Sequence, residues 1–329
     1  MIEVENLSKK YGTFEAVKGV SFSLGHDQVL GFLGPNGAGK TTVMKMLTAF
    51  HFPTSGQVKI DGISIEDDPV EVKKRIGYLP ENNPLYGDMN SDEYLSFIAS
   101  ARLIPKGKRQ KALDGAIAAC GLEEVRKQRI ENLSKGYKQR VGLAQAIIHD
   151  PEILILDEPT SGLDPNQIIE IRSLIRELGK SKTVILSTHI LQEVEAVCSQ
   201  VLILNEGRIA AQGTAEEIAL SLKGRDTWEL LLKGSSDAEK LLAGRSLPAF
   251  QGRAPDEISV TKDENGIVKL NFIIQAQRLG GDYSADGELI FDWALSQGYK
   301  IIGMNRKKLS LEDIFVKLTS DPPAGGGKG

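Results

Sequence analysis

Apolar residues recur along this chain with two different spacings. Short alternating or β-branched segments predict strands at 2–7, 16–24, 28–33, 57–61 and 75–79. From about residue 92 to residue 150 the apolar positions instead recur every three or four residues, which predicts helices. An all-helical stretch between strands is typical of a subdomain that projects from a sheet, and we place this helical subdomain at about 84–150.

Two continuous apolar runs follow the helical stretch. Ile153 to Leu156 and Thr183 to Leu186 lack the polar alternation of a half-exposed strand, so both are predicted to lie in the middle of a parallel sheet. A helix with apolar residues at 168, 171, 175 and 178 separates them and ends at Gly179. This order predicts a doubly wound α/β core, in which ligands bind at the carboxyl ends of the strands.

The C-terminal part of the chain follows a different pattern. It predicts a strand at 227–232, a helix at 238–242, two strands around 263–266, a helix at 289–296 and a strand at 300–304. This is the order of a small α+β accessory domain of the ferredoxin-like type, followed by a helix that Ser310 would cap. The predicted limits are 1–222 for the first domain, 225–319 for the accessory domain and 320–329 for a flexible tail.

Composition and charge narrow the classes of function. The 329 residues are 41% hydrophobic and 26% charged, as in ordinary soluble proteins. A net charge of −4 leaves no basic excess, which disfavours a protein that coats nucleic acid. The acidic, strand-like N-terminus does not resemble a signal peptide, and no apolar run approaches the length of a membrane span. We therefore expect a cytoplasmic protein that reaches a membrane only through a partner.

The strongest chemical signal is the pattern G-x-x-x-x-G-K-[ST]. It lies between an apolar run and the start of a helical pattern, the context that a phosphate-binding loop requires. Its glycines let the backbone wrap a polyphosphate, Lys40 can neutralise the outer phosphates, and the Thr41 hydroxyl can ligate Mg²⁺. A glycine-rich turn with a solvated lysine is the alternative. The residues of the pattern are Gly34, Pro35, Asn36, Gly37, Ala38, Gly39, Lys40 and Thr41.

Polar residues end both buried strands. Asp157 and Glu158 follow the first strand, and consecutive side chains there point to opposite sides, so the two acids can serve two roles. Asp157 suits a water-mediated ligand for the Mg²⁺ that Thr41 touches, and Glu158 suits the base or water-orienting group for hydrolysis. His189 follows the second strand, where a neutral imidazole can hydrogen-bond the γ-phosphate or the attacking water. An acidic loop and a structural histidine are the alternatives.

Two further segments are candidates for nucleotide binding only because the chain also contains a phosphate loop. Ser134 stands where the N-cap of a helix belongs, with Gly136 and flanking cations, so this helix start is either a second anion site or only a good cap. Tyr11 lies at the tip of the first turn, where its ring either stacks on a base or is an ordinary surface aromatic. Two anion sites and one nucleotide fit together if the second site serves a neighbouring subunit.

In this order and spacing, the motifs resemble the ATP-binding cassette ATPase family over about residues 1–220. Residues 34–42 look like its phosphate loop, 153–158 like its Walker B strand and 161–164 like its D-loop. The resemblance implies a P-loop cassette with bound ATP and Mg²⁺, with an antiparallel β subdomain and a helical subdomain. It also implies that His189 is the switch histidine, that Tyr11 stacks on adenine and that Thr42 belongs to the phosphate loop.

The resemblance implies partners as well. Two such subunits would sandwich two ATP molecules, each between Lys40 of one chain and residues 134–136 of the other. Closure on ATP and opening after hydrolysis would drive a separate multi-span permease held against the helical subdomain, on the cytoplasmic face of the membrane. We expect a pair of identical subunits rather than two different ones, and no nucleic acid.

Two positions depart from the family's pattern. The signature usually reads LSGGQ, whereas residues 133–137 read LSKGY, so Lys135 adds a cation where a small residue is usual. Glu81 stands where the Q-loop normally carries glutamine; its carboxylate can still ligate Mg²⁺ but adds negative charge near the γ-phosphate. We expect these two departures to affect the geometry of the metal site and the resting ATPase rate, but not the class of reaction. Residues 81–86, the variant signature and residues 309–315 are similar to those of bacterial exporter-type cassettes of the multidrug and gliding-motility kinds.

We therefore expect the ATP-hydrolysing subunit of a membrane exporter. One alternative is a soluble cassette ATPase that acts on nucleic acid or ribosomes, but such chains usually show two cassettes, a long coiled coil or basic arms. The other is a module that uses ATP only as a clamp. The complete set of Asp157, Glu158 and His189 argues against a clamp.

Overall fold

The computed structural model describes residues 1–215, 217–218, 225–233, 256–262, 267–275, 283–307 and 311–320. The chain divides into two compact units, one of Met1–Thr214 with the chain from Leu318 onward, and one of Ala215–Lys317. Each unit has its own hydrophobic core and is described by itself. The predicted domain boundary at 222–225 falls largely outside the described residues, so the domain limits stay predictions.

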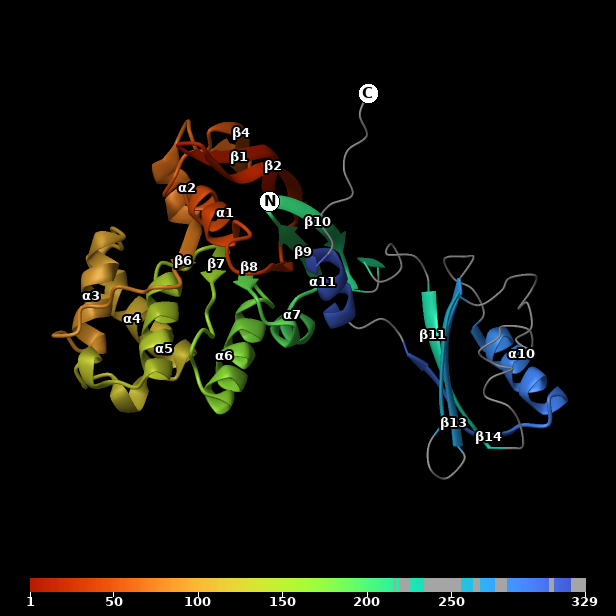
Figure 1. Cartoon of the computed structure of the whole chain (residues 1–329). Helices are drawn as coiled ribbons and strands as arrows, with labels where there is room; N and C mark the ends of the chain where they lie inside the picture. Colours follow the sequence, from red (N-terminus) through yellow and green to blue (C-terminus); the bar gives the residue numbers. More distant parts are fainter. Residues whose placement is uncertain are drawn as a thin grey trace. The chain divides into compact units, whose positions relative to one another are not determined.

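The centre of the first unit is a six-stranded sheet with the order β10-β9-β3-β8-β7-β6 (Figure 1). Its strands are β3 (Val29–Leu33), β6 (Ile76–Leu79), β7 (Ile153–Asp157), β8 (Thr183–Thr188), β9 (Gln200–Asn205) and β10 (Arg208–Gly213). Neighbouring strands are parallel except for β10, which is antiparallel to β9. Every residue of β3, β7 and β8 is buried, as their continuous apolar runs predict. The predicted α/β core is confirmed.

A smaller antiparallel sheet has the order β2-β1-β4-β5 and confirms the predicted β subdomain. It consists of β1 (Ile2–Tyr11), β2 (Phe14–Leu24), β4 (Ser55–Ile60) and β5 (Ile63–Ser64). The first two strands run further than the sequence predicts, because Tyr11 pairs with Phe14 and only Gly12 and Thr13 form the turn. This hairpin tip therefore carries two aromatic residues side by side.

Successive residues of β7 point to opposite faces of the main sheet and belong to two different cores. Ile153 and Ile155 pack in the core shared with the antiparallel sheet and α1 (Lys40–Leu47). Leu154 and Leu156 pack in the core shared with helices on the other face. A sheet packed closely on both faces holds the ends of its strands in fixed positions.

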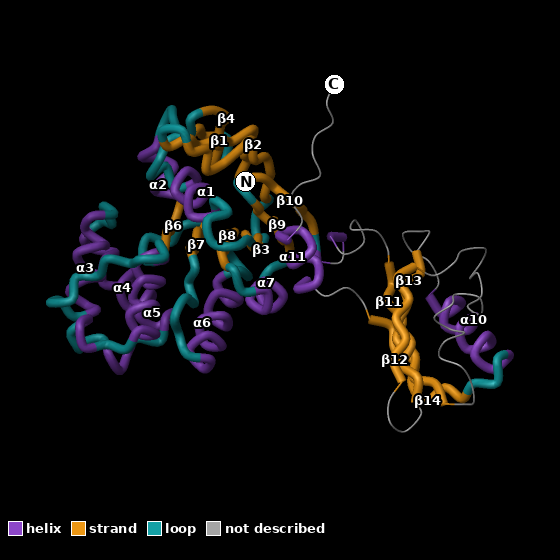
Figure 2. Tube along the Cα trace, in the orientation of Figure 1, coloured by secondary structure: helices purple, strands orange, loops and turns teal. Residues whose placement is uncertain are grey.

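The helical subdomain contains α3 (Ser91–Ala101), α4 (Lys106–Cys120) and α5 (Lys135–Ile147), which lie together in Figures 1 and 2. A capping box begins α3, in which Glu93 N donates to Asn90 Oδ1 at 3.0 Å and Asn90 N donates to Glu93 Oε2 at 2.9 Å. Outside this subdomain the first unit has α2 (Pro69–Arg75), α6 (Pro165–Leu178) and α7 (Leu191–Val197). Across the described part of the chain, no helix has the length and hydrophobicity that a membrane span needs.

The second unit is an antiparallel sheet with the order β12-β13-β11-β14 and a helix, α10 (Tyr283–Ser296) (Figure 2). Its strands are β11 (Arg225–Lys233), β12 (Asp256–Lys262), β13 (Ile267–Gln275) and β14 (Lys300–Lys307). Trp228, Leu230 and Phe272 from the sheet pack with Ile290 and Trp293 from the helix. This strand order is the one a ferredoxin-like domain has. The predicted helix at 238–242 and turn at 263–266 lie outside the described residues.

The last helix, α11 (Leu311–Ser320), begins close to the predicted position. Its predicted cap, Ser310, lies outside the described residues. At the other end of the helix, Asn205 Nδ2 donates to the Leu318 carbonyl at 3.1 Å, which ties the end of β9 to the returning chain within the first unit.

A partly buried histidine makes the stability of the first unit depend on pH. Burial, with a smaller contribution from Arg102, lowers the pKa of His149 to about 4, although the hydrogen bond of its ring to the Ile76 carbonyl at 3.1 Å opposes the shift. An unfolded imidazole protonates near its ordinary pKa of about 6.5, so between these two values protonation favours the unfolded chain.

We expect the free energy of unfolding to fall by about 1–2 kcal/mol between pH 7.5 and pH 5 because of His149 alone. Urea unfolding of the parent and of His149→Gln at both pH values measures this contribution, since glutamine can still donate to Ile76 but does not titrate. Equal losses of stability in the two chains would show that His149 is not the cause.

Candidate functional site

The glycine-rich loop joins β3 to α1 at the edge of the main sheet. Gly37 and Gly39 have φ angles of +81° and +105°, which side chains strongly disfavour. A Cβ at Gly39 would also lie 2.6 Å from the Ala16 carbonyl oxygen, so the tight approach of this loop to β2 requires glycine. No side chain caps the first turn of α1, which leaves its N–H groups available to an anion.

Lys40 is buried, and its amine points back into the loop. Its Nζ donates to the Gly34 carbonyl at 2.7 Å and the Pro35 carbonyl at 3.3 Å, and lies 3.4 Å from Glu158 Oε1. This arrangement suits a polyphosphate, because the amine can neutralise the phosphate oxygens while the backbone N–H groups of the loop donate hydrogen bonds to them.

A cavity of about 470 Å³ opens beside this loop. It is lined by the loop residues Pro35 to Thr42 and by four polar residues from other segments. Three of these, Glu81, Glu158 and His189, are predicted site residues, and the fourth, Ser161, is not. Phe14 and Ala16 complete it. The fold thus brings the phosphate loop, the Q-loop position and both strand ends to one place.

Asp157 is fully buried at the end of β7 and is only half satisfied. Its Oδ1 accepts from Thr41 Oγ1 at 3.4 Å and from Ser187 Oγ, whereas its Oδ2 has no hydrogen-bond partner among the described residues. Burial raises the pKa of its carboxyl above the ordinary value, against the two hydrogen bonds, and the carboxylates of Glu81 and Glu158 raise it further.

These residues fit a divalent cation. The Asp157 carboxyl, with its unpaired oxygen, lies close to the Thr41 hydroxyl and to the carboxylates of Glu81 and Glu158. A metal ion would neutralise this excess of negative charge. The described residues contain no group of three or more His, Cys, Asp or Glu side chains that would form a complete metal cage. Mg²⁺ needs no such cage, since it keeps water and phosphate ligands and takes only one or two from protein.

The two carboxylate oxygens of Glu158 face different partners. Its Oε1 faces Lys40, while its Oε2 lies 2.9 Å from His189 Nδ1. Its backbone has φ +49°, a sparsely populated conformation for a glutamate, and its N–H donates to the Ser187 carbonyl at 3.1 Å. The surrounding strands therefore hold the side chain in a strained but fixed orientation toward the cavity, as functional residues often are.

The sequence comparisons decide the family. The family model for ABC transporters matches residues 17–161. The chain is 39% identical over 322 residues to the bacitracin transport ATP-binding protein BcrA of Bacillus licheniformis, covering 97% of each chain. It is 36% identical over 250 residues to the linearmycin resistance ATP-binding protein LnrL of Bacillus subtilis, covering 75% of this chain and 79% of that protein. The chain belongs to the ABC transporter ATP-binding subunits.

A solved structure supports the same conclusion. The chain resembles an ATP-binding subunit of an ABC transporter with a TM-score of 0.61 and 31% identity, over 67% of this chain and 92% of that one. The expected family and cassette fold are therefore confirmed. As an ABC subunit, the chain binds ATP.

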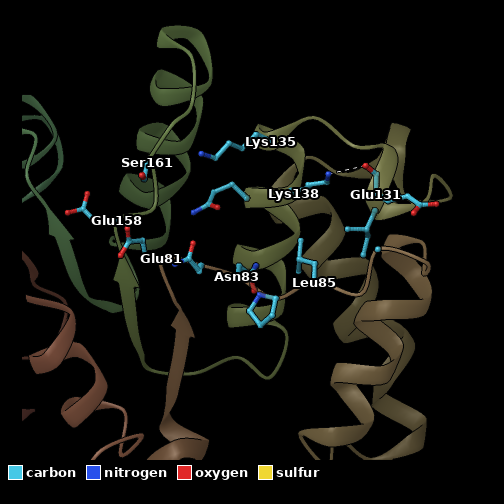
Figure 3. Close-up of a pocket in the computed structure, with 13 residues that line it drawn as sticks. Glu81, Asn83, Leu85, Glu131, Lys135, Lys138, Glu158 and Ser161 are labelled. Carbon is cyan, nitrogen blue, oxygen red and sulfur yellow. Dashed lines mark hydrogen bonds between the residues drawn. The ribbon is translucent and has the colours of Figure 1, made fainter. Parts of the chain in front are cut away.

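The signature segment of this ABC subunit does not line the phosphate-loop cavity. Ser134 caps α5 by accepting from Tyr137 N at 3.3 Å, and Gly136 lies so close to Gln167 that an added Cβ would meet its Cδ at 2.7 Å. Lys135 lines a second cavity of about 560 Å³, which shares Glu81, Glu158 and Ser161 with the first. In Figure 3 the Lys135 side chain points across this cavity toward Ser161.

Lys135 also contacts the D-loop of its own chain. A Cβ at Gly162, where φ is +67°, would lie 2.1 Å from Lys135 Nζ. The cation that departs from the usual signature thus lies directly against the D-loop. The sequence gives no sign of this contact, because the two segments are joined only through the packing of α5 beside α6.

The aromatic residue at the cavity is Phe14, not the predicted Tyr11. The Tyr11 ring is exposed and meets His51 edge-on, with 6.2 Å between ring centres, while Lys9 Nζ lies 5.5 Å from the Tyr11 centre. Tyr11 does not line either cavity described above, so base stacking by Tyr11 stays a prediction. Phe14 falls outside the predicted strands 2–7 and 16–24 and is not among the predicted site residues. The signal that could have found it is the two-residue turn that places it opposite Tyr11.

The raised pKa of Asp157 gives a test of its role that does not depend on activity. Because the fold favours the neutral carboxyl, ionisation of Asp157 lowers the free energy of unfolding as the pH rises through its folded pKa. At pH 7.5 without metal, Asp157→Asn should therefore melt roughly 2–4 °C above the parent. It should lose the further rise that Mg²⁺ and an ATP analogue give the parent.

Thermal melts with and without Mg²⁺ check both effects. Asp150→Asn is the matched control, since Asp150 is exposed and pairs with Lys182 away from the cavity. If Asp157→Asn gains as much from Mg²⁺ as the parent does, Asp157 is not part of a metal site.

Proposed function

We propose that this ABC subunit hydrolyses ATP and that the hydrolysis powers export through a separate membrane permease. The observation that carries the proposal is the position of Glu158, buried at the phosphate-loop cavity between Lys40 and His189. A carboxylate fixed there faces the place where a γ-phosphate and its attacking water would meet.

In this proposal the phosphate loop, with Gly34 to Thr42, holds the triphosphate. Lys40 would exchange its carbonyl contacts for β- and γ-phosphate oxygens, and the first N–H groups of α1 would donate to the same oxygens. Thr41, Asp157 and Glu81 would hold Mg²⁺, whose charge neutralises the phosphates. The protein's share in this step is to fix the phosphates in one geometry.

Glu158 and His189 would act on the water. Glu158 accepts a proton from the water as its oxygen attacks the γ-phosphorus and the bond to the β-phosphate oxygen breaks. His189 lies beside Glu158 with its ring partly exposed to the cavity, so it can hold the γ-phosphate or the water in line. The proton then leaves Glu158 with the released phosphate.

A second subunit completes the proposed site. Ser134, Lys135 and Gly136 lie away from the phosphate loop of their own chain, so in a head-to-tail pair they would meet the nucleotide of the other chain. The start of α5 offers backbone N–H groups, and Lys135 adds a positive charge. A pair of identical subunits needs nothing beyond the residues of this chain.

The permease would contact the helical subdomain. Tyr86 and Phe97 are 47% and 45% exposed, and their ring centres lie 5.6 Å apart, so together they present an aromatic surface to solvent. Aromatic surfaces are enriched in protein interfaces. No helix in the described part of the chain could span a membrane, and in this proposal the membrane component is a separate protein. Relatives named for bacitracin transport, linearmycin resistance and Nod factor export favour export as the direction.

Replacing Glu158 with glutamine tests hydrolysis. Glutamine keeps the shape of the side chain but cannot take the water's proton, so turnover should fall by at least about 100-fold while ATP affinity changes little. Glu158→Gln should also hold intact ATP in a stable pair of chains on gel filtration. Glu152→Gln, immediately before the same strand, is the control and should match the parent. Parent-like turnover of Glu158→Gln would contradict the mechanism.

Replacing Phe97 with serine tests the permease contact. The loss of a central aromatic contact should cost about 2 kcal/mol of binding and reduce co-purification with the permease by about 30-fold. Phe291→Ser is the matched control, because Phe291 is also 45% exposed but lies in the second unit. Equal retention of the membrane protein by both variants would place the contact elsewhere.

A further inference from the structure

A buried carboxylate lies behind the cavity and is not used by the mechanism above. Glu193, in the first turn of α7, is 1% exposed. Its Oε1 accepts from Thr160 Oγ1, and its Oε2 accepts from Thr188 Oγ1 at 2.7 Å. Both threonines are buried as well. Each carboxylate oxygen of Glu193 therefore holds one hydroxyl inside the protein.

The two hydroxyls belong to the segments that carry the proposed catalytic pair. Thr160 follows Glu158 by two positions, and Thr188 immediately precedes His189. Glu193 thus joins the loop after β7 to the end of β8, across the same gap that the contact between Glu158 and His189 spans. The Ile190 N–H also donates to Thr188 Oγ1 at 3.0 Å, which fixes the turn just after His189.

The charge of Glu193 is weakly compensated. Arg172 Nη2 lies 3.8 Å from Glu193 Oε1, beyond hydrogen-bond distance, so the carboxylate depends mainly on the two hydroxyls. A buried carboxylate costs more free energy than an apolar side chain in the same place. What an apolar side chain could not do is accept two hydroxyl groups at once and fix the separation of two loops.

We propose that Glu193 is a positioning residue for hydrolysis. It holds Thr160 and Thr188 at a fixed separation and thereby keeps Glu158 Oε2 at hydrogen-bond distance from His189 Nδ1. This inference rests on the proposed hydrolysis, which it deepens, and it concerns a residue that touches neither nucleotide nor metal. It predicts that kcat depends on Glu193 and that the affinity for ATP does not.

Three variants test the role, each as the full chain assayed with MgATP. In Glu193→Gln only one oxygen remains to accept, so kcat should fall about 10- to 100-fold while KM changes less than about threefold. Thr188→Val, which removes one donor, should lower kcat similarly. Thr188→Ser keeps the hydroxyl and should restore kcat to within about threefold of the parent. Glu170→Gln is the control and should keep parent kcat, because Glu170 is an exposed residue of α6 that pairs with Arg140 of α5.

A second measurement separates positioning from simple loss of structure. Adding Glu193→Gln to His189→Ala should lower kcat no further, because the pair that Glu193 positions is already broken. Active chains are counted by bound ATP analogue, so that kcat refers to folded protein. A Glu193→Gln chain that melts earlier but keeps parent kcat per bound nucleotide would overturn the inference, as would additive losses in the double variant.

The outcomes also distinguish this inference from the proposed function. If the parent binds ATP but shows no turnover, with or without its permease, the proposed hydrolysis fails and the role of Glu193 fails with it. If the parent turns over and both Glu193→Gln and Thr188→Val do so at the parent rate, only the positioning role is wrong. Should Glu193→Gln not fold, the comparison of Thr188→Val with Thr188→Ser decides the question.

Discussion

The carboxyl end of β7 imposes the constraint on which the site depends. This strand is buried along its whole length, yet it delivers Asp157 and Glu158 into a region that water hardly reaches. Carboxylates in such a place are strongly destabilising without donors or cations around them. The neighbouring elements supply Lys40 from α1, a hydroxyl from Ser187 on β8 and the ring of His189. The parallel register makes this convergence possible, because it sets Asp157 directly beside Ser187.

These contacts do not fully compensate the cost of burying the two carboxylates, and what is left uncompensated favours the binding of a ligand. Asp157 keeps one oxygen without a partner among the described residues, and Glu158 sits in a strained backbone conformation. Both features lower the stability of the isolated chain. A cation that enters the cavity with a polyphosphate would pair with the free Asp157 oxygen, and the strained backbone would keep Glu158 directed at the phosphate. A site built in this way gains stability from its ligand, since part of the ligand's binding free energy offsets a cost already present in the fold.

Most of the fold and much of the site could be predicted from the sequence because the decisive signals are local. The continuous run 153–156 specifies a strand buried on both faces, and the eight-residue glycine pattern specifies a loop between strand and helix. The acids at 157 and 158 could then be placed at the strand's end. Each of these inferences needs only neighbouring residues and one periodicity.

The residues that sequence reasoning missed depend on non-local contacts. Ser187 was seen only as part of a polar strand end, and its bond to Asp157 follows from the pairing of β7 with β8. Phe14 reaches the cavity because a two-residue turn sets it opposite Tyr11. Glu193 lies on a helix of ordinary pattern, and its burial becomes evident only when Thr160 and Thr188 are seen on either side of it. Ser187 and Glu193 have partners 30 and 33 residues away, in Asp157 and Thr160, which no local pattern indicates, whereas the turn beside Phe14 is a local signal.

The placement of Lys135 carries the argument for two subunits one step further. Its amine lies against Gly162 of the D-loop, while the cavity it lines shares Glu158 and Ser161 with the phosphate-loop cavity. Lys135 therefore lies between the segment proposed to face the partner's nucleotide and the D-loop, which follows the chain's own Glu158. In the proposed pair of subunits, Lys135 would lie between the partner's nucleotide and the D-loop of its own chain.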